Sequence, residues 1–368
     1  MIDENILKSE EKAVFALRSL YRRYGYLPYK MSKFEEYEYY IQNKDFLVSD
    51  RIITFNDTNG RLLALKPDVT LSIIKNCEDR PGCKQKVYYN ENIYRVSGNT
   101  GHYKEIMQTG LECIGDIDLY DIYETVSLAA QSLALVSEDF VLQISHLGIL
   151  SAVLDRICPN PKFQQAAIGY ISGKNAHDLD RLCKEYGVEE KSARMLSKFV
   201  CVYGQRKQVL SQLDGICGQW AGEALDELKQ LSGLLDRSPY SDRIIFDFSV
   251  VNNMNYYNGI VFKGFLSGIC DGVLAGGQYD KLMQKMERKA GAIGFALYLD
   301  LLEQLPAQKN GYDVDVLLVY SPAADPAAVC ETVERLTAAG KTVSAQKCIP
   351  PKLRCRELVE LGKEEGSC

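Results

Sequence analysis

The stretch that most constrains the fold is residues 85–115, QKVYYNENIYRVSGNTGHYKEIMQTGLECIG. Two runs rich in Tyr, Val and Ile flank the polar loop VSGNTG, whose Ser, Gly and Asn residues are typical of turns. We therefore expect a long hairpin, with its first strand over residues 86–95 and its second over residues 102–114.

The second strand would carry an unusual set of side chains on one face. Because successive strand residues point to opposite faces, Lys104, Ile106, Gln108, Gly110 and Glu112 share a face. Unpaired polar groups on a buried face cost ~1–3 kcal/mol each. A small polar ligand over Gly110 would satisfy Gln108 and Glu112, and the glycine would let it approach closely. A solvent-exposed sheet face explains the same pattern, so the hairpin alone leaves both interpretations open.

A second polar position precedes the hairpin. Two short strands around the turn NDTNG, at residues 52–55 and 62–65, lead into the sequence LKPDVT. Pro67 disfavours helix at the residue before it and is well tolerated at a helix start. Asp68 and Thr70 are therefore expected where a strand passes into a helix. Asp68 either caps that helix or points a carboxylate at the cation of a ligand.

Helical and strand patterns organise the rest of the chain. Residues 10–24 and 119–136 have helical periodicity, and residues 148–240 are helical in pattern throughout, which predicts an inserted helical subdomain. A glycine-rich loop is expected at residues 274–282, followed by a helix over residues 290–305.

The tail has a pattern of its own. Residues 311–368 predict a short α/β segment with strands at 313–320 and 342–346 and a helix between them at 326–338. Residues 351–361 are expected to form a final helix.

Composition argues against several function classes. The chain of 368 residues has a net charge of −6, a pI near 5.4 and no basic run, so we expect no nucleic-acid partner. No apolar run approaches the ~18–20 residues that span a bilayer, so no membrane partner is expected. The 12 cysteines are scattered singly without C-x-x-C spacing, and we expect no metal and no other cofactor. Cysteines used as small hydrophobic residues, behind a charged N-terminus with no signal-peptide core, indicate a reducing cytoplasm.

Five blocks of the sequence, in order, resemble the class II aminoacyl-tRNA synthetase fold and, within it, the histidyl-tRNA synthetase branch. The blocks are LKPDVT, the hairpin, NYYNGIVFKG, LAGGQYDKL and AGAIGFALYLDLL, and the resemblance extends over about residues 6–305. It implies an α+β fold with an antiparallel sheet flanked by helices. The synthetase-like core would cover residues 1–310, with the helical insert at about 148–240. Residues 311–368 would be a short α/β segment, for which a partial anticodon-binding-like domain is one interpretation.

The resemblance also implies a histidine-binding pocket without catalytic residues. Asp68 falls on an acid that holds the α-amino group of the substrate in that family, and Thr70 falls two positions further on, as it does there. Arg95 falls on the arginine of motif 2, which meets a carboxylate or a phosphate.

Four further positions complete that pocket. Gln108 and Glu112 fall on a glutamine and a glutamate that face the histidine substrate, and Tyr256 and Tyr257 fall on a tyrosine pair that closes over the imidazole. A ligand with an ammonium, a carboxylate and an imidazole group needs acids, an arginine and an aromatic wall. The set supplies all three.

The positions that serve amino-acid activation in that family differ here. Asn252, Asn253 and Asn255 stand where the family has an arginine, a glycine and an aspartate. Motif 3 ends in Gly-Leu-Glu-Arg, with the arginine holding ATP, whereas Asp300 and Leu301 fall on the last two of those positions. A leucine cannot offset the charge of a triphosphate.

A synthetase-like chain with this pocket and without the ATP-binding residues is similar to the regulatory subunits of short-form ATP phosphoribosyltransferase. That resemblance implies a non-catalytic subunit, required with the short catalytic subunit for the first step of histidine biosynthesis. Histidine would be its feedback effector, and the subunit would act as a homodimer within a larger hetero-oligomer. Two alternatives stay open, namely a diverged histidyl-tRNA synthetase and a synthetase-like amino-acid-sensing protein.

Overall fold

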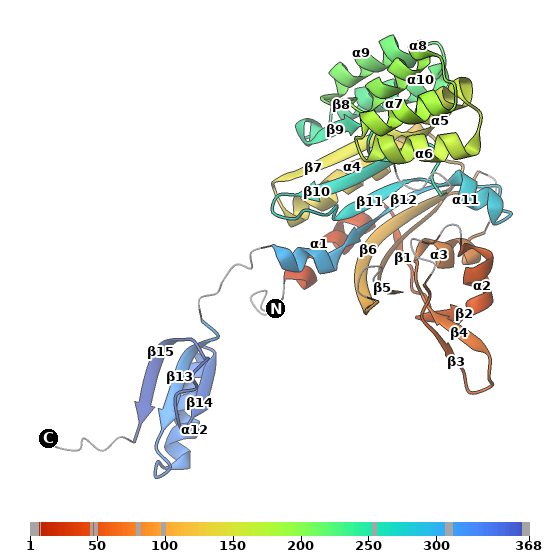
Figure 1. Ribbon diagram of the computed structural model, residues 1–368. Helices are drawn as coiled ribbons and strands as arrows, with labels where there is room; N and C mark the ends of the chain where they lie inside the picture. Colours follow the sequence, from red (N-terminus) through yellow and green to blue (C-terminus); the bar gives the residue numbers. More distant parts are fainter. Residues whose placement is uncertain are drawn as a thin grey trace. The chain divides into compact units, whose positions relative to one another are not determined.

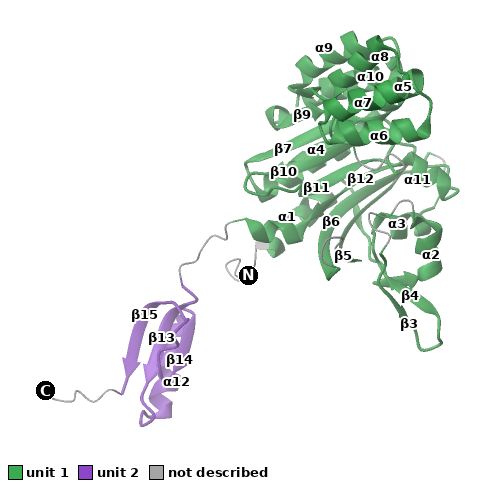
Figure 2. Ribbon diagram, viewed as in Figure 1, with its two compact units in different colours: residues 1–305 green, residues 306–368 purple. Residues whose placement is uncertain are grey.

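The chain forms two compact units, Met1–Leu305 and Pro306–Cys368, and each is described by itself (Figure 2). The computed structural model describes residues 7, 9–44, 47, 51–78, 82–96, 101–251, 256–305 and 312–362. The tip of the predicted hairpin loop, residues 97–100, lies outside these ranges.

A nine-stranded sheet is the frame of the first unit, in the order β1-β5-β6-β12-β11-β10-β7-β9-β8 (Figure 1). The strands are β1 (Leu27–Pro28), β5 (Gln85–Val96), β6 (Tyr103–Gly115), β7 (Phe140–His146), β8 (Tyr203–Gly204), β9 (Ile244–Asp247), β10 (Ile260–Leu266), β11 (Leu274–Gln278) and β12 (Gly291–Tyr298). Neighbouring strands are antiparallel except β1–β5 and β7–β9, which are parallel. The predicted hairpin is present as β5 and β6, and the sheet is mainly antiparallel, with a parallel pair toward each end.

Two helices cover one face of this sheet (Figure 1). They are α1 (Ser9–Arg23) and α4 (Leu119–Val136), both close to their predicted limits. The helix α4 begins where it does because the Asp118 carboxylate accepts hydrogen bonds from the backbone N–H groups of Tyr120 and Asp121, while Asp121 bonds back to the Asp118 N–H. On β6, Leu111 and Cys113 point into the core beneath these helices, which leaves the alternate residues for the other face.

A small substructure packs against that other face. It contains the sheet β2-β4-β3 and two short helices, with bounds β2 (Phe34–Glu36), α2 (Tyr37–Gln42), β3 (Thr54–Asn56), β4 (Leu62–Leu65) and α3 (Thr70–Asn76). The β3–β4 pair is the hairpin predicted around NDTNG. Its apolar residues form a second core cluster, which includes Tyr40, Ile73, Tyr89 and Tyr279.

The helical pattern that begins near residue 148 is present as a run of six helices in the described part of the chain. They are α5 (Leu147–Ile157), α6 (Pro161–Ser172), α7 (Ala176–Glu185), α8 (Glu190–Phe199), α9 (Arg206–Cys217) and α10 (Gly222–Leu235), and a 3-10 turn, η3 (Ser241–Arg243), follows. Their buried residues belong to the same apolar core as the large sheet.

The prediction for residues 274–305 is wrong. The expected glycine-rich loop is the strand β11, followed by the short helix α11 (Asp280–Lys285), and the expected helix is the strand β12 followed by a 3-10 helix, η4 (Leu299–Gln304). Close packing explains the glycines, because a Cβ on Gly276 would lie 2.4 Å from the Gly294 carbonyl oxygen.

The second unit has a three-stranded parallel sheet, β14-β13-β15, and one helix, α12, between two of its strands in sequence. The elements are β13 (Val314–Tyr320), α12 (Pro326–Ala338), β14 (Val343–Gln346) and β15 (Cys355–Leu361). The helix expected at residues 351–361 is instead the strand β15. Pairing with β13 decides this, because Val359 lies opposite Leu318 and Leu361 opposite Tyr320.

Candidate ligand-binding pocket

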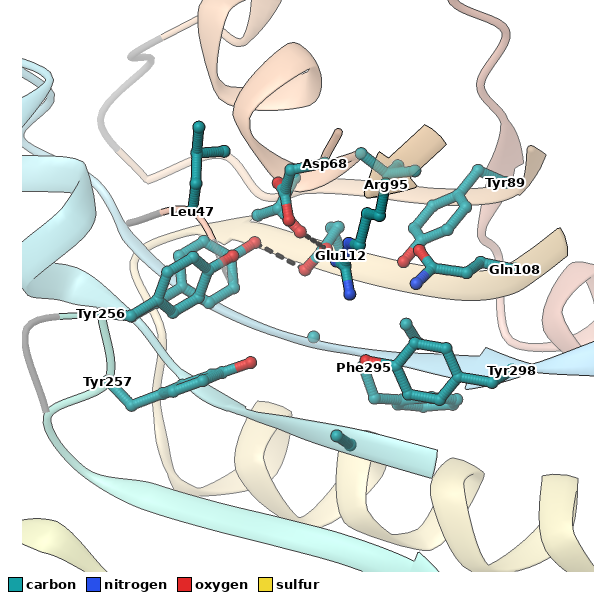
Figure 3. A pocket seen from close by; sticks show the side chains of 16 residues that line it. Leu47, Asp68, Tyr89, Arg95, Gln108, Glu112, Tyr256, Tyr257, Phe295 and Tyr298 are labelled. Carbon is teal, nitrogen blue, oxygen red and sulfur yellow. Dashed lines mark hydrogen bonds between the residues drawn. The ribbon is translucent and has the colours of Figure 1, made fainter. Parts of the chain in front are cut away.

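All seven residues predicted to bind a ligand line one cavity of about 400 Å³ (Figure 3). They come from the segment before α3, from both strands of the hairpin and from the segment before β10. The residues are Asp68, Thr70, Arg95, Gln108, Glu112, Tyr256 and Tyr257. Segments separated by up to about half of the chain therefore meet at the face of the sheet that α1 and α4 leave free.

Glu112 is the most buried acid of the cavity, with 2% of its surface exposed. The Thr70 hydroxyl donates to Glu112 Oε1 at 2.7 Å, and the Tyr279 hydroxyl donates to Oε2 at 2.6 Å. Burial raises the pKa of the Glu112 carboxyl to about 8, these two hydrogen bonds oppose the rise, and nearby Asp68 adds to it. A carboxyl group with this pKa is mostly protonated at neutral pH, and a cationic or donor group of a ligand would favour the carboxylate.

A glycine beneath this carboxylate makes room for it. Gly294 on β12 pairs with Glu112 on β6, and a Cβ on Gly294 would lie 1.7 Å from Glu112 Oε2. The glycine at this position is a condition for the pocket, since any side chain would displace the acid.

The predicted use of Gly110 is wrong. A Cβ at this glycine would lie 2.2 Å from the Phe295 carbonyl oxygen and 2.6 Å from the Tyr89 hydroxyl. Gly110 therefore accommodates Tyr89 from the paired strand, and a ligand does not reach it. Of the two interpretations left open for the polar face, a solvent-exposed sheet face does not hold for Gln108 and Glu112, which are 4% and 2% exposed.

Asp68 bonds to the start of a helix, as one of its two predicted roles requires, and it also lines the cavity. Its Oδ1 accepts a hydrogen bond of 2.9 Å from the Leu71 backbone N–H in the first turn of α3, and its side chain also lines the cavity. Burial raises the pKa of the Asp68 carboxyl, while the Leu71 hydrogen bond and the charge of Arg95 act in the opposite direction. The hydrogen bond to the first turn thus fixes the Asp68 carboxylate at the N-terminus of α3.

Arg95 supplies the positive charge of the cavity. Its Nε donates to the Pro67 carbonyl oxygen at 3.2 Å, which ties β5 to the segment that carries Asp68. The guanidinium group points into the cavity between Asp68 and Tyr298 (Figure 3). Two acids and one arginine therefore surround the space, a charge pattern that suits a ligand with an ammonium and a carboxylate.

Tyrosines form a further wall of the cavity. The ring centroids of Tyr256 and Tyr257 are 4.5 Å apart, and those of Tyr256 and Tyr279 are 5.6 Å apart. Burial raises the pKa of all three phenols well above the ordinary value, so they remain neutral hydrogen-bonding groups.

Sequence reasoning missed Tyr89, Tyr279 and Tyr298, which line the same cavity. For Tyr279, a signal was present in the block LAGGQYDKL. Gly277 pairs with Gly294, which pairs with Glu112, so a strand through these glycines brings Tyr279 close to the acid. Treating the block as a loop concealed this relationship.

Comparison with known proteins assigns the chain to a family. The family model described as histidyl-tRNA synthetase matches residues 3–302. The chain belongs to the histidyl-tRNA synthetase family. The resemblance inferred from the five sequence blocks is thereby confirmed.

Several relatives of this histidyl-tRNA synthetase family member have informative names. A protein of Oceanobacillus iheyensis named ATP phosphoribosyltransferase regulatory subunit is 27% identical over 326 residues, which cover 87% of this chain and 80% of that protein. The crystal structure of an ATP phosphoribosyltransferase regulatory subunit/histidyl-tRNA synthetase from Bacillus halodurans matches with a TM-score of 0.77 and 22% identity, covering 98% of this chain and 96% of the other. The ATP phosphoribosyl transferase (HisG:HisZ) complex from Thermotoga maritima has a chain that matches with a TM-score of 0.63 and 19% identity, over 79% of this chain and 97% of that chain. The two structures support the fold.

The resemblance places Asp300 and Leu301 at two positions that serve activation in the histidyl-tRNA synthetase family, and neither residue carries a positive charge. Leu301 in η4 packs against the apolar core, and the Oδ1 atom of Asp300 is buried without a hydrogen-bond partner among the described residues. The positions Asn252, Asn253 and Asn255 lie outside the described residues.

Neither a metal-binding cluster nor a membrane-spanning helix occurs in the described part of this family member. No group of three or more His, Cys, Asp and Glu side chains there could hold a metal ion. No helix among the same residues has the length and apolarity needed to cross a membrane.

Proposed function

We propose that this chain is the regulatory subunit of a short-form ATP phosphoribosyltransferase, without synthetase activity of its own. Relatives that match over most of the chain carry that name, at 27% and 25% identity in two cases. The subunit would be required for the first step of histidine biosynthesis and would transmit feedback inhibition by histidine to a catalytic partner. A reducing cytoplasm is the compartment that this role implies.

One observation carries the proposal. The cavity has the chemistry to bind an amino acid, with two acids, an arginine and a tyrosine wall, while a core-packed leucine stands at the position of the ATP-binding arginine. Such a site suits binding of an amino acid without its activation. Leu301 carries no positive charge, so it cannot hold a triphosphate together with Arg95.

We propose one orientation for histidine in the cavity. Its ammonium group would bind Asp68, its carboxylate Arg95, and its imidazole Glu112 and Gln108, with Tyr256 and Tyr257 against the ring. The Thr70 hydroxyl donates to Glu112, and its lone pairs can still accept a hydrogen bond from an ammonium group. Thr70 would therefore both position the imidazole-binding acid and bind the ammonium group together with Asp68.

We also propose that the subunit forms a homodimer inside a larger hetero-oligomer with the catalytic subunit. The strand β1 ends the sheet, so one of its edges has no neighbouring strand among the described residues. Leu27 on β1 is 67% exposed and Phe15 on α1 is 54% exposed. An open edge beside exposed apolar side chains favours association with another chain.

Reconstitution tests the proposal. The purified chain, mixed with a short-form catalytic subunit, should give ATP phosphoribosyltransferase activity that neither protein has alone, and histidine should inhibit it. Coupling of this kind requires histidine to bind the inhibited arrangement more tightly, typically by ~1–3 kcal/mol. Lack of activation by the chain would refute the regulatory role. Histidine-dependent ATP–pyrophosphate exchange by the chain alone would instead show a diverged synthetase.

A further inference from the structure

Tyr298 closes one end of the cavity. It is the last residue of β12, from which Gly294, Phe295, Ala296 and Tyr298 line the cavity, and three of these, Gly294, Ala296 and Tyr298, share one face of the strand. They lie opposite Glu112, Gly110 and Gln108 respectively. On this strand the residue opposite Glu112 is therefore a glycine, and the residue opposite Gln108 is a tyrosine, whose ring bounds the cavity at that end.

The position of the Tyr298 side chain is fixed on several sides. Its backbone N–H donates to the Val273 carbonyl oxygen at 2.8 Å, which holds the end of β12 in the sheet. The side chain extends from the strand over Phe295, and its hydroxyl points toward Arg95 (Figure 3). Burial raises the pKa of the Tyr298 phenol, whereas the charge of Arg95 and a hydrogen bond to it oppose that rise. The phenol is thus a neutral partner of the arginine.

This contact limits what Arg95 can bind. Its Nε is already bonded to the Pro67 carbonyl oxygen, and Tyr298 engages the guanidinium group from the other side. The remaining N–H groups face the cavity and match the two oxygens of one carboxylate. Beyond the guanidinium group the rings of Tyr89 and Tyr298 bound the cavity (Figure 3).

The sequence around Tyr298 agrees with this role. Because Asp300 and Leu301 fall on the last two positions of Gly-Leu-Glu-Arg, Tyr298 falls on the glycine. A glycine leaves this place empty, whereas a tyrosine fills it with one of the largest side chains.

We propose that Tyr298 is a specificity-determining residue that restricts the pocket to a free α-amino acid and excludes one whose carboxyl group carries a nucleotide-sized substituent. The inference rests on the proposed function, since it concerns the same amino-acid pocket. This restriction explains how a member of this family can bind an amino acid and release it unchanged. The bound ligand has a free carboxylate, because no further group attached to that carboxylate fits beside Tyr298.

The test compares two ligands in the full-length chain by isothermal titration calorimetry. One is L-histidine, and the other is the sulfamoyl adenosine conjugate of L-histidine, which keeps a negative charge next to the α-carbonyl group and adds a nucleoside. Wild type should bind histidine and bind the conjugate at least ~100-fold more weakly, because an added group that meets a packed wall forces costly rearrangement. Equal affinities in wild type would overturn the inference without any variant.

Two substitutions refine the comparison. Tyr298→Ala removes the ring and should bind the conjugate at least ~10-fold more tightly than wild type does. Tyr298→Phe keeps the ring and loses the hydroxyl, so it should still reject the conjugate. If Tyr298→Phe admits the conjugate as well as Tyr298→Ala does, or if neither admits it, Tyr298 does not set specificity.

The outcomes separate this inference from the proposed function. If histidine binds and inhibits the reconstituted enzyme while the conjugate binds wild type equally well, the inference alone fails. If wild type binds no histidine, the proposed pocket fails, and the inference falls with it.

Discussion

The Thr70 hydroxyl donates a hydrogen bond of 2.7 Å to Glu112, although 42 residues separate the two in the chain. This bond joins the start of α3 to the second strand of the hairpin. Tyr279 donates to the other oxygen of the same carboxylate at 2.6 Å. Both oxygens of Glu112 are thus held before any ligand arrives, and a bound imidazole would find the acid in a fixed position.

Loss of the Glu112 carboxylate should weaken histidine binding most. Glu112→Ala removes the acceptor for the ligand and leaves two buried hydroxyls unpaired, at a cost of ~2–3 kcal/mol, or about 30- to 150-fold in Kd. Isothermal titration calorimetry with histidine measures the change. Glu105→Ala is the matched control, because Glu105 lies on the same strand and is exposed, and its affinity should equal that of wild type. Equal binding by wild type and Glu112→Ala would refute the site.

A methyl group at position 294 should close the pocket. In Gly294→Ala the new Cβ would lie 1.7 Å from Glu112 Oε2, so the carboxylate must leave its two hydroxyl partners. We expect histidine binding to be lost and the free energy of unfolding to fall by ~1–3 kcal/mol. Chemical denaturation and calorimetry measure the two effects. Gly233→Ala in α10 is the control, because a Cβ at Gly233 would have no atom within 4 Å apart from the neighbouring backbone of its own helix. This variant should be at least as stable as wild type.

The pH dependence of stability should report the raised pKa of Glu112. The folded state has a pKa of about 8 at this carboxyl, compared with 4.5 for the free group. Between these two values the folded protein keeps a proton that the unfolded chain releases. The stabilisation is therefore complete below pH ~4.5 and is lost as the pH rises through ~8.

Urea unfolding between those pH values measures this effect in wild type and in Glu112→Gln, which cannot titrate. The difference in the free energy of unfolding between the two proteins should change with pH in this window and level off above it. A constant difference across the window would contradict the raised pKa.

A buried ion pair should be important for the geometry of the pocket. Lys66 is fully buried and bonds to Glu91 on β5 at 2.9 Å, next to the Asp68 segment. Glu91→Gln leaves a buried ammonium group without its counter-charge, and we expect a loss of ~3–5 kcal/mol in the free energy of unfolding. The double variant Lys66→Met with Glu91→Leu should recover most of that loss.

Denaturation by urea distinguishes these variants. Glu190→Gln serves as the matched control, because the Glu190–Arg194 pair is exposed and its removal should have no measurable effect. If Glu91→Gln is as stable as the double variant, the unpaired Lys66 ammonium group does not destabilise the protein, and the prediction is wrong.

Much of the site was predictable because its signals are local. Alternation along β6 placed Gln108 and Glu112 on one face, and Pro67 placed Asp68 at a helix start; both features depend on residues within a few positions of each other. The family resemblance then added Arg95 and the pair Tyr256 and Tyr257. All of these residues line one cavity.

The run GAIGFALY shows where local signals end. Its small and apolar residues suit a buried helix as well as a central strand, and the sequence alone favoured the helix. Pairing with β6 and β11 made it the strand β12. The same pairing set Gly294 beneath Glu112 and Tyr298 opposite Gln108.

The sequence by itself therefore determined the hairpin, the helices flanking the sheet and the identity of the acids, the arginine and the tyrosine pair. Only the tertiary structure decided that Gly110 accommodates Tyr89, that Thr70 and Tyr279 hold Glu112, and that Tyr298 lines the same cavity as Arg95. The physical reason is that periodicity and turn propensity act between near neighbours in the chain. Burial, hydrogen bonding and steric exclusion depend instead on which distant strands lie side by side.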